Sequence, residues 1–510
     1  MKQSPDEIAE NLDRRDFLKG AGVVGGAAGA IGLVWYGTRE DDGPPEPEPP
    51  EREPPEPPEI EPPEEDPPEE PPDEEPPDEE PPEEPPEEEI PYADEFDTVV
   101  RAVDAGADPE GQEPVNALFR EHSGSNTLFA FDSGTYRFEP FRVSNRSVGI
   151  VGIGDENPKF VPTEGGCRGG NPYYFFEKIS DLVLDSIDFD FRDSDAGGPI
   201  HLFLTGESTI KDVSCRGTCG NQLGIARIEV HDPEGSAHVE NLEASNVEGD
   251  NSLTGVYVSS EHAGELTFEE CHLGDFSDNG LYASSPGGPN GRDGPVHVVG
   301  GTYRNNNIAN VRLGSTGSTA ERVSILVDKE THGWGQLNSR GIRLRNRGSQ
   351  VIRDCDITFA EEAAYSFGAI VFHSANGGGT VENTQIQIDR NEIPAIKTFP
   401  PAEDPDEPPV VENVTITGNA NGGVIADIEG RDGTVFRNCT IEQTGSKRDG
   451  LRFRNAQDCR IVDCTIESGG DPVILSNASA TLENTTLSTP DGERTISEGR
   501  FENERLSVNG

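Results

Sequence analysis

The chain of 510 residues is poor in lysine, methionine and aromatic residues. Lysine supplies only 8 of the 40 basic residues, methionine occurs once, and aromatic residues make up 6%. The 97 acidic residues leave a formal net charge of −57. Such a surface would repel a phosphate backbone, which excludes a general nucleic-acid binder. A hydrophobic content of 32% also excludes a protein that crosses the membrane repeatedly.

The surplus of acid and the scarcity of lysine favour a protein from a halophile. At molar salt the Debye length falls to about 3 Å, so neighbouring carboxylates repel each other only weakly. Together with the export signal described next, this composition points to a haloarchaeon. An ordinary acidic secreted protein is the alternative.

An arginine pair precedes the first apolar run of the chain. Arg14 and Arg15 are followed by a Phe-Leu-Lys triplet and by an apolar, glycine-rich run over 20–36. This arrangement resembles a twin-arginine export signal, with Asp13 where Ser or Thr is usual. The run of 17 residues is short for a membrane span of about 20. We expect 1–38 to be a signal that is cleaved or, alternatively, kept as an N-terminal anchor at the cell surface.

A tract rich in Pro and Glu follows the signal. Residues 43–90 hold 21 Pro, 23 acidic residues and one Arg. Proline pairs favour polyproline II, and like charges extend the chain further. At about 3.1 Å per residue the tract could span on the order of 150 Å. We expect 39–91 to be a disordered linker that acts as a tethered stalk or, alternatively, as a solubilising tail left after cleavage.

Four short motifs mark the start of a folded region. They are Asp-Ala-Gly-Ala-Asp-Pro-Glu-Gly at 104–111, a short helical stretch at 115–121, Gly-Thr-Tyr at 134–136 and Val-Gly-Ile-Val-Gly-Ile-Gly at 148–154. Their order resembles the N-terminal cap of the pectate-lyase superfamily of right-handed β-helices. The resemblance covers about 96–165, and it implies a cap with the first coils over 92–165.

A repeated unit runs through the rest of the chain: an apolar residue, any residue, Asn or Asp, two residues, and another apolar residue. Three of the twelve matches are degenerate. The Asn/Asp position falls at Asp185, Asp212, Asn241, Glu270, Gly300, Leu326, Asp354, Asn383, Asn413, Asn438, Asp463 and Asn484, about 27 residues apart on average. Short β-rich units of variable length indicate a solenoid. We predict an all-β, single-stranded right-handed parallel β-helix of about 12 coils over 166–490, with a C-terminal cap or tail over 491–510.

The eight cysteines have no spacing that marks a metal site. We interpret them mainly as small buried core residues. Cys439 and Cys464 stand at equivalent positions of two successive repeats and should stack on each other. A disulfide between Cys215 and Cys219 is the alternative for that pair.

Many repeats contain a second strand that typically begins with Gly and then alternates, and that carries an outward stripe of side chains. If its apolar residues face the core, the intervening ones face outward. The predicted outward residues are Arg227, Glu229, Tyr257, Ser259, Tyr282, Ser284, Arg312, Arg343, Arg345, His373, Lys397, Asp427, Arg452 and Arg454, and seven of these fourteen are basic. A basic stripe with tyrosines on an acidic protein fits an anionic polymer. Salt bridges to acidic neighbours on the next sheet are the alternative.

We therefore predict a monomer that binds an acidic polysaccharide or a cell-surface glycan along this stripe. The predicted contacts are Arg312, Arg343, Arg345, Tyr257, Tyr282, Arg452 and Arg454, with His332 and Trp334 from a flanking loop. Whether the protein is also an enzyme is left open. A non-catalytic glycan-binding, adhesive or structural surface protein is the alternative.

The resemblance implies a specific chemistry, if the protein is active. Polysaccharide lyases of this fold use a base and cationic side chains, often with Ca²⁺ held by carboxylates. By analogy, Lys397 or His373 would be the base, and Arg343 and Arg345 would clamp the substrate carboxylate. Hydrolysis needs carboxylates placed across the groove instead, and Asp427 is the candidate.

Overall fold

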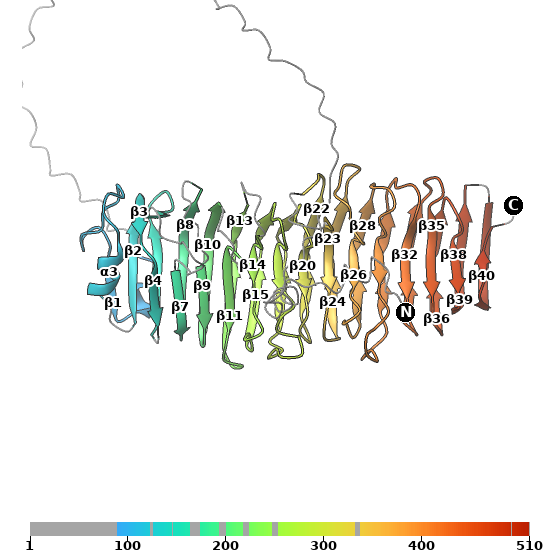
Figure 1. Ribbon diagram of the computed structural model, residues 1–510, viewed down its shortest axis with the longest axis horizontal. Helices are drawn as coiled ribbons and strands as arrows, with labels where there is room; N and C mark the ends of the chain where they lie inside the picture. The colour runs from blue at the N-terminus through green and yellow to red at the C-terminus, as the bar shows by residue number, and fades with distance from the viewer. Residues whose placement is uncertain are drawn as a thin grey trace, which may run out of the picture. The chain divides into compact units, whose positions relative to one another are not determined.

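The computed structural model describes residues 89–508, except 123–125, 145, 164–173, 193–199, 218–223, 247–252, 332–336 and 491. The predicted signal and almost all of the predicted linker lie outside these residues. The described residues form a parallel solenoid whose strands stack side by side along its axis (Figure 1). Three ladders of strands run along it, and each strand pairs with its equivalent in the next coil.

From β2 onward, a strand of the second ladder follows each strand of the first. The first ladder contains β1 (Thr98–Arg101), β2 (Thr127–Asp132), β5 (Val148–Ile153), β8 (Leu182–Phe191), β10 (Glu207–Gly217), β12 (Ser236–Glu240), β15 (Glu265–Glu269), β18 (Val296–Val299), β21 (Thr319–Glu321), β24 (Gln350–Arg353), β27 (Gly379–Glu382), β30 (Val410–Glu412), β33 (Val435–Arg437), β36 (Cys459–Val462) and β39 (Ser479–Thr489). The second contains β3 (Thr135–Phe138), β6 (Lys159–Pro162), the later parts of β8, β10 and β39, and β13 (Glu243–Ser245), β16 (His272–Gly274), β19 (Thr302–Arg304), β22 (Ser324–Val327), β25 (Asp356–Phe359), β28 (Gln385–Ile388), β31 (Thr415–Thr417), β34 (Thr440–Gln443) and β37 (Thr465–Ser468).

The third ladder is a separate sheet, called sheet B from here on. Its parallel strands are β4 (Phe141–Ser144), β7 (Tyr174–Ile179), β9 (Ile200–Leu204), β11 (Ala226–Val230), β14 (Val256–Tyr257), β17 (Leu281–Ala283), β20 (Ala309–Leu313), β23 (Arg340–Leu344), β26 (Ile370–Phe372), β29 (Ile396–Thr398), β32 (Val424–Glu429), β35 (Asp449–Arg454) and β38 (Val473–Ser476). Loops of variable length join sheet B to the other two ladders on either side.

A left-handed residue makes the sharp turn between the first and second ladders. The twelve turn residues with positive φ are Ser186, Asp212, Asn241, Glu270, Gly300, Arg322, Asp354, Asn383, Asn413, Asn438, Asp463 and Asn484. Asn, Asp and Gly tolerate this conformation best, which explains the repeated residue type. The amide groups also stack: Asn241 Nδ2 donates to Asp212 Oδ1 at 2.6 Å, and Asn413 Nδ2 donates to Asn383 Oδ1 at 3.1 Å.

The solenoid of about 12 coils is confirmed, but two predicted turn positions are wrong. Asp185 precedes the turn, which Ser186 makes. Leu326 lies within strand β22, and Arg322 makes the turn of that coil. Both errors occur where the turn residue is neither Asn, Asp nor Gly, so the residue type gave no signal there.

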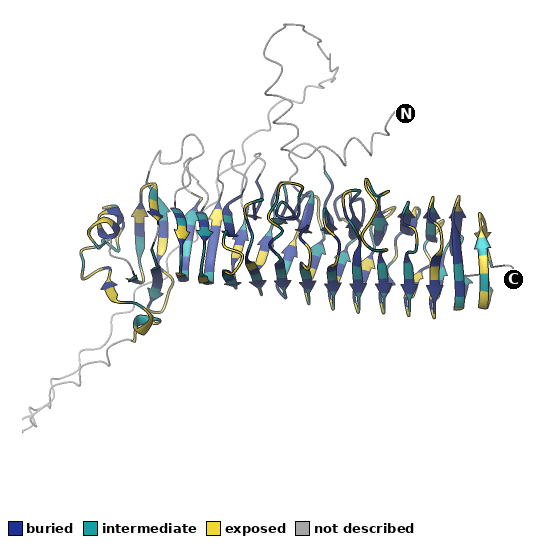
Figure 2. Ribbon diagram, turned by 90° about the horizontal axis from the view of Figure 1, so that it is seen from below, coloured by how far each residue is buried: buried dark blue, intermediate teal, exposed yellow. Residues whose placement is uncertain are grey.

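Alternating apolar residues form a main core that runs through the solenoid. Buried segments recur in the strands of successive coils in Figure 2. The six described cysteines are free thiols within the main core, which confirms their predicted core role. Burial raises the pKa of Cys215 and of Cys271 to about 12. The thiols of Cys439 and Cys464 interact with each other, as the predicted stacking requires, and this contact raises the pKa of Cys439. Cys215 is free, and Cys219 lies outside the described residues.

The two ends of the core are covered by different elements. At the N-terminal end, helix α3 (Asn116–Glu121) buries Leu118 and Phe119, close to the predicted helical stretch. A short 3₁₀ helix, η1 (Ala93–Glu95), precedes the first strand. At the C-terminal end, β40 (Gly492–Glu502) pairs antiparallel with β39, and β41 (Arg505–Leu506) pairs antiparallel with β38. The reversed, mostly exposed β40 ends the parallel stacking (Figure 2).

Two fully buried arginines hold the loops at the edges of sheet B. The Arg431 guanidinium donates to the backbone carbonyls of Phe399, Asn376 and His373 at 3.1, 2.7 and 2.8 Å. Burial lowers its pKa to about 10, so it still carries its charge near neutral pH. Arg448 binds the carbonyls of Gly422 and Ile393 in the same way. Each arginine therefore ties the loops of successive coils together.

Replacing Arg431 with Met should lower the free energy of unfolding by about 3 kcal/mol, because three buried carbonyls would lose their donor. Denaturant unfolding measures the change. The matched control is Arg437→Met, since Arg437 is half-exposed and forms a 3.5 Å ion pair with Glu412. We expect a loss below about 1 kcal/mol for the control. Equal losses for the two variants would contradict the structural role of Arg431.

Candidate functional site

The outward side chains of sheet B stand in register from coil to coil. Strand pairing aligns them in a central column of Arg142, Phe175, His201, Arg227, Tyr257, Tyr282, Arg312, Arg343, Val371, Lys397, Asp427 and Arg452. Eight of these are residues of the predicted stripe. The strands that carry them follow one another from β4 to β35 in Figure 1. Parallel pairing thus converts a sequence repeat into a continuous line of side chains.

A second column lies two residues further along each strand. It includes Glu177, Phe203 and Glu229 in the first coils, Arg345 and His373 in the middle, and Glu429 and Arg454 near the end. Between β20 and β29 the two columns carry Arg312, Arg343, Arg345 and Lys397 and no acidic residue. We call these four residues the basic centre.

The basic centre is less exposed than a surface stripe. Arg312 and Arg343 are only 3% and 4% exposed, and Tyr257 is also buried. The Arg312 guanidinium lies 3.9 Å from the centre of the Tyr282 ring, and its Nε donates to Ser284 Oγ at 2.7 Å. Long side chains therefore lie along the sheet against aromatic rings. The half-exposed members, Arg345 and Lys397, offer the accessible charge.

Lys397 stands between two aromatic rings. Its Nζ lies 5.0 Å from the centre of the Phe367 ring and 4.8 Å from that of Phe399. Both rings attract a cation through their electron-rich faces. This contact favours the ammonium form, whereas a base that removes a proton from a substrate must be neutral.

His373, the other predicted base, is almost fully buried. Its Nδ1 accepts a hydrogen bond from the backbone N–H of Ala375 at 2.9 Å. In the neutral ring the proton is then on Nε2. Because the lone pair of Nδ1 already accepts the Ala375 N–H, neither nitrogen is left to accept a proton from a substrate.

Asp427 is bound by arginines at the C-terminal end of the columns. Arg452 and Arg454 both reach its Oδ2 at 3.0 Å, and Arg454 also reaches Glu429 at 2.7 Å. Burial alone would raise the pKa of Asp427, but the two arginines lower it below its ordinary value. The carboxylate therefore stays ionised and lacks the proton that a general acid donates. For Arg452 and Arg454, the alternative prediction of salt bridges to acidic residues therefore applies. The acidic partner lies within sheet B and not on the next sheet.

The N-terminal coils of sheet B carry an aromatic cluster that sequence reasoning missed. Phe141, Arg142, Phe175, His201, Phe203 and Arg227, with Pro140, line a hollow of about 540 Å³, which we call the aromatic trough. The Phe175 and Phe203 ring centres are 5.0 Å apart, edge to face. The strands β7 and β9 do not begin with Gly, so the pattern used to find the stripe passed over them. Alternation within 174–179 and 200–204 was the available signal.

Two ion pairs border the trough. Arg142 pairs with Glu177, and Arg227 donates to Glu229 at 2.9 Å. The fully buried Glu229 also accepts from His231 Nε2 at 2.8 Å and from the backbone N–H of Ser259 at 3.2 Å.

His201 in the trough and Glu229 beside it both have shifted pKa values. Burial alone would raise the pKa of Glu229, but its bonds to His231, Arg227 and Ser259 lower it to about 2. Burial, with the charge of Arg227, lowers the pKa of His201 to about 4, so this ring is neutral at pH 7.

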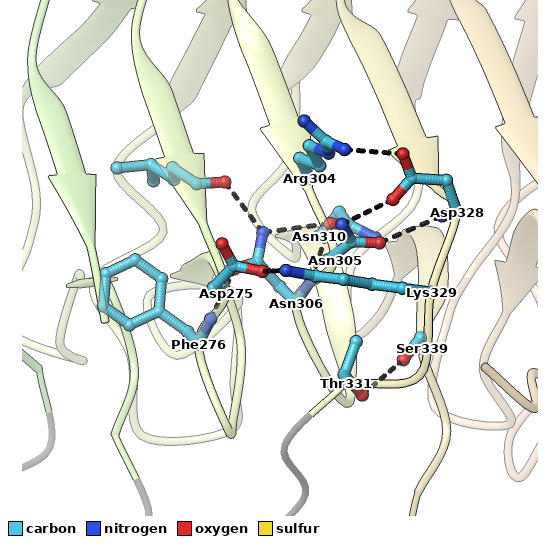
Figure 3. A network of polar contacts seen from close by, with 11 residues as sticks. Asp275, Phe276, Arg304, Asn305, Asn306, Asn310, Asp328, Lys329, Thr331 and Ser339 are labelled. Atoms are coloured by element: carbon cyan, nitrogen blue, oxygen red, sulfur yellow. Dashed lines mark hydrogen bonds and ion pairs between the residues drawn. The ribbon is translucent and has the colours of Figure 1, made fainter. Parts of the chain in front are cut away.

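A buried network of asparagines fixes the corner before β20, the strand that carries Arg312 (Figure 3). Asn306 Nδ2 donates to the Leu273 carbonyl and to Asn310 Oδ1, both at 2.9 Å. Its Oδ1 accepts from the backbone N–H of Phe276 at 3.0 Å. Because a buried amide satisfied on both sides resists movement, this corner holds the start of β20 in one position.

In the described part of the chain, no three His, Cys, Asp or Glu side chains lie close enough together to hold a metal ion. None of its helices is long and apolar enough to cross a bilayer. His332 and Trp334, the predicted loop contacts, lie outside the described residues.

Two family models match the chain. Residues 403–496 match the model described as a right handed beta helix region. The solenoid is a right-handed parallel β-helix. Residues 11–30 match the twin-arginine translocation pathway signal sequence, which confirms the predicted signal and indicates export across the membrane. No curated protein matches the chain.

Several solved structures resemble this β-helix. The catalytic unit of an alpha-1,3-glucanase from Streptomyces thermodiastaticus is 12% identical, with a TM-score of 0.36 over 76% of this chain and 63% of that one. This chain thus spans less than two thirds of the glucanase unit. A surface adhesin of Streptococcus pneumoniae is 12% identical, with a TM-score of 0.37 over 81% and 99% of the two chains. A mannuronan C-5 epimerase A-module from Azotobacter vinelandii is 13% identical, with a TM-score of 0.37 over 77% and 100%. At this similarity these structures carry no functional conclusion.

Glu229→Gln should lower the free energy of unfolding by about 3 kcal/mol at neutral pH. The pKa of Glu229 falls from 4.5 to about 2 on folding. The stability that Glu229 contributes is therefore complete above pH 4.5, its pKa in the unfolded chain. It disappears as the pH falls through about 2, its pKa in the folded chain. Denaturant unfolding from pH 7 to pH 2 should show the two proteins converging below about pH 4. A difference that is independent of pH would contradict this assignment. Glu483→Gln, at a half-exposed carboxylate 3.4 Å from Arg460, is the control.

Proposed function

We propose that this exported protein binds an acidic polysaccharide across the coils of sheet B. The observation that carries the proposal is the basic centre: four basic residues and no acidic one in the two outward columns between β20 and β29, on a chain of net charge −57. An anionic polymer approaching this protein is repelled over most of the surface and attracted at the basic centre. The four cap motifs that resemble the pectate-lyase superfamily agree with a carbohydrate ligand.

The coil spacing suits a polymer that runs parallel to the solenoid axis. Neighbouring parallel strands are about 4.8 Å apart, so each coil presents an equivalent side chain at that interval. Arg345 offers a planar fork to a carboxylate or sulfate, and Lys397 offers a point charge two coils further on. The acidic remainder of the surface fits a saline habitat, and the linker over 39–91 fits a tether that presents this face to the surroundings.

Binding without cleavage is the interpretation that the candidate catalytic groups favour. Asp427 is held ionised by two arginines, and the Nδ1 of His373 is occupied by a main-chain N–H. The rings beside Lys397 stabilise its ammonium form. Asp427 thus lacks the proton of a general acid, and the surroundings of His373 and Lys397 oppose the role of a base.

The double variant Arg345→Glu/Lys397→Glu should lose at least tenfold in affinity for polygalacturonate or alginate, because both accessible cations of the basic centre become anions. Binding of the full chain is measured at several salt concentrations. Arg437→Glu/Arg460→Glu makes the same change of charge on the outer face of the first ladder and should keep its affinity. Equal losses in both variants, or no polyanion binding by the unmodified chain, would contradict the proposal. Reducing ends or unsaturated product would overturn the non-catalytic interpretation.

A further inference from the structure

We propose that the aromatic trough binds an uncharged sugar ring, so that the glycan held by sheet B includes a neutral pyranose beside its acidic residues. This inference rests on the proposed function, because it places the neutral ring on the same polymer. The trough lies on β4, β7, β9 and β11, three coils before the basic centre, which corresponds to about 14 Å along the axis.

Aromatic rings are exposed on the outer face of these strands. Phe175 and Phe203 point away from the core and remain partly accessible, whereas Phe141 packs against the core and borders the hollow with its partly accessible edge. Clustered accessible rings on a protein with only 6% aromatic residues cost solubility and mark a binding surface. Their flat apolar faces complement the C–H face of a pyranose, while the arginines and His201 at the edge can bond to hydroxyl groups.

The hollow also has a suitable size for a sugar ring. Its volume of about 540 Å³ falls within the range of roughly 300 to 1,000 Å³ that is typical of small-ligand sites. Tyr257 and Tyr282 continue the aromatic surface towards the basic centre, with ring centres 5.2 Å apart. A single chain of sugars could therefore contact both regions.

The charge of the trough indicates the class of ligand. Each arginine of the trough is matched by a glutamate, Arg142 by Glu177 and Arg227 by Glu229, and His201 is neutral at pH 7. The formal charge of the trough and its bordering carboxylates is thus zero, in contrast to the basic centre. A uronate would be repelled by the carboxylates here as well as attracted by the arginines. An uncharged ring would experience no net attraction or repulsion from these charges.

The trough is also rigid before any ligand arrives. Glu229 holds Arg227 through two hydrogen bonds, and the Arg227 guanidinium lies 4.5 Å from the Phe203 ring centre and 5.7 Å from that of Tyr257. A preformed site loses little conformational entropy on binding.

Neutral hexasaccharides of β-1,4-glucan, β-1,4-mannan and β-1,3-glucan, with oligogalacturonate for comparison, test the proposal on the full chain. We expect at least one neutral hexasaccharide to bind, and Phe175→Ala and Phe203→Ala each to weaken it about three- to tenfold. Phe175→Tyr keeps the ring and should keep the affinity. Phe501→Ala removes a partly buried ring beside Arg494, 5.8 Å away, in the C-terminal hairpin and is the matched control. Unchanged melting temperatures show that the variants are folded.

The outcomes separate this inference from the function on which it rests. If oligogalacturonate binds but no neutral hexasaccharide does, the inference is wrong and the proposed function stands. If neutral binding survives both alanine variants, or falls equally in Phe501→Ala, the trough is not the site. If neither class of sugar binds, the proposed function fails as well.

Discussion

Parallel pairing in exact coil-to-coil register is the constraint on which this structure depends. Because each strand hydrogen-bonds to the same position of the next coil, any residue type that repeats in the sequence becomes a column in space. The left-handed turn between the first two ladders keeps that register while the loops vary in length. Asn241 above Asp212 and Asn413 above Asn383 show the consequence at the turn, where amide groups bond along the axis.

The same register concentrates charge. An acidic protein gains nothing from isolated arginines on its surface, since each is surrounded by carboxylates. In the central column, Arg312, Arg343 and Lys397 come together with no acidic residue between them, although acidic residues predominate in the chain. Where an acidic residue occupies a position in the columns, as Glu229 and Asp427 do, it pairs with a neighbouring arginine and holds that side chain in place. The outer face of sheet B thus has three parts. They are an aromatic N-terminal end in which arginines and glutamates are paired, the basic centre, and a C-terminal end in which Asp427 forms salt bridges.

Much of the fold and part of the candidate site could be predicted from sequence, and the division has a physical reason. Asn and Asp at the turn are specified by backbone conformation, so their spacing predicted ten of the twelve turns. It failed at Asp185 and Leu326, where Ser186 and Arg322 adopt the left-handed conformation without the favoured residue type. Alternation also predicted which residues share the outward column. It could not predict that Arg312 is buried against the Tyr282 ring, or that Asp427 is clamped by Arg452 and Arg454, because those contacts depend on neighbours one coil away. Most of the aromatic trough was missed because strands β7 and β9 lack the initial glycine.

Chemical footprinting of lysine tests the central claim most directly, because the chain has so few lysines. Lys397 is the only lysine of the two outward columns of sheet B, while Lys211 and Lys447 lie elsewhere on the described surface. The full chain is acetylated with and without polygalacturonate, and modification at each lysine is measured by mass spectrometry. The account predicts protection of Lys397 alone among these three. Equal protection of Lys211 and Lys447, or unchanged modification of Lys397 under conditions where the polymer binds, would contradict it.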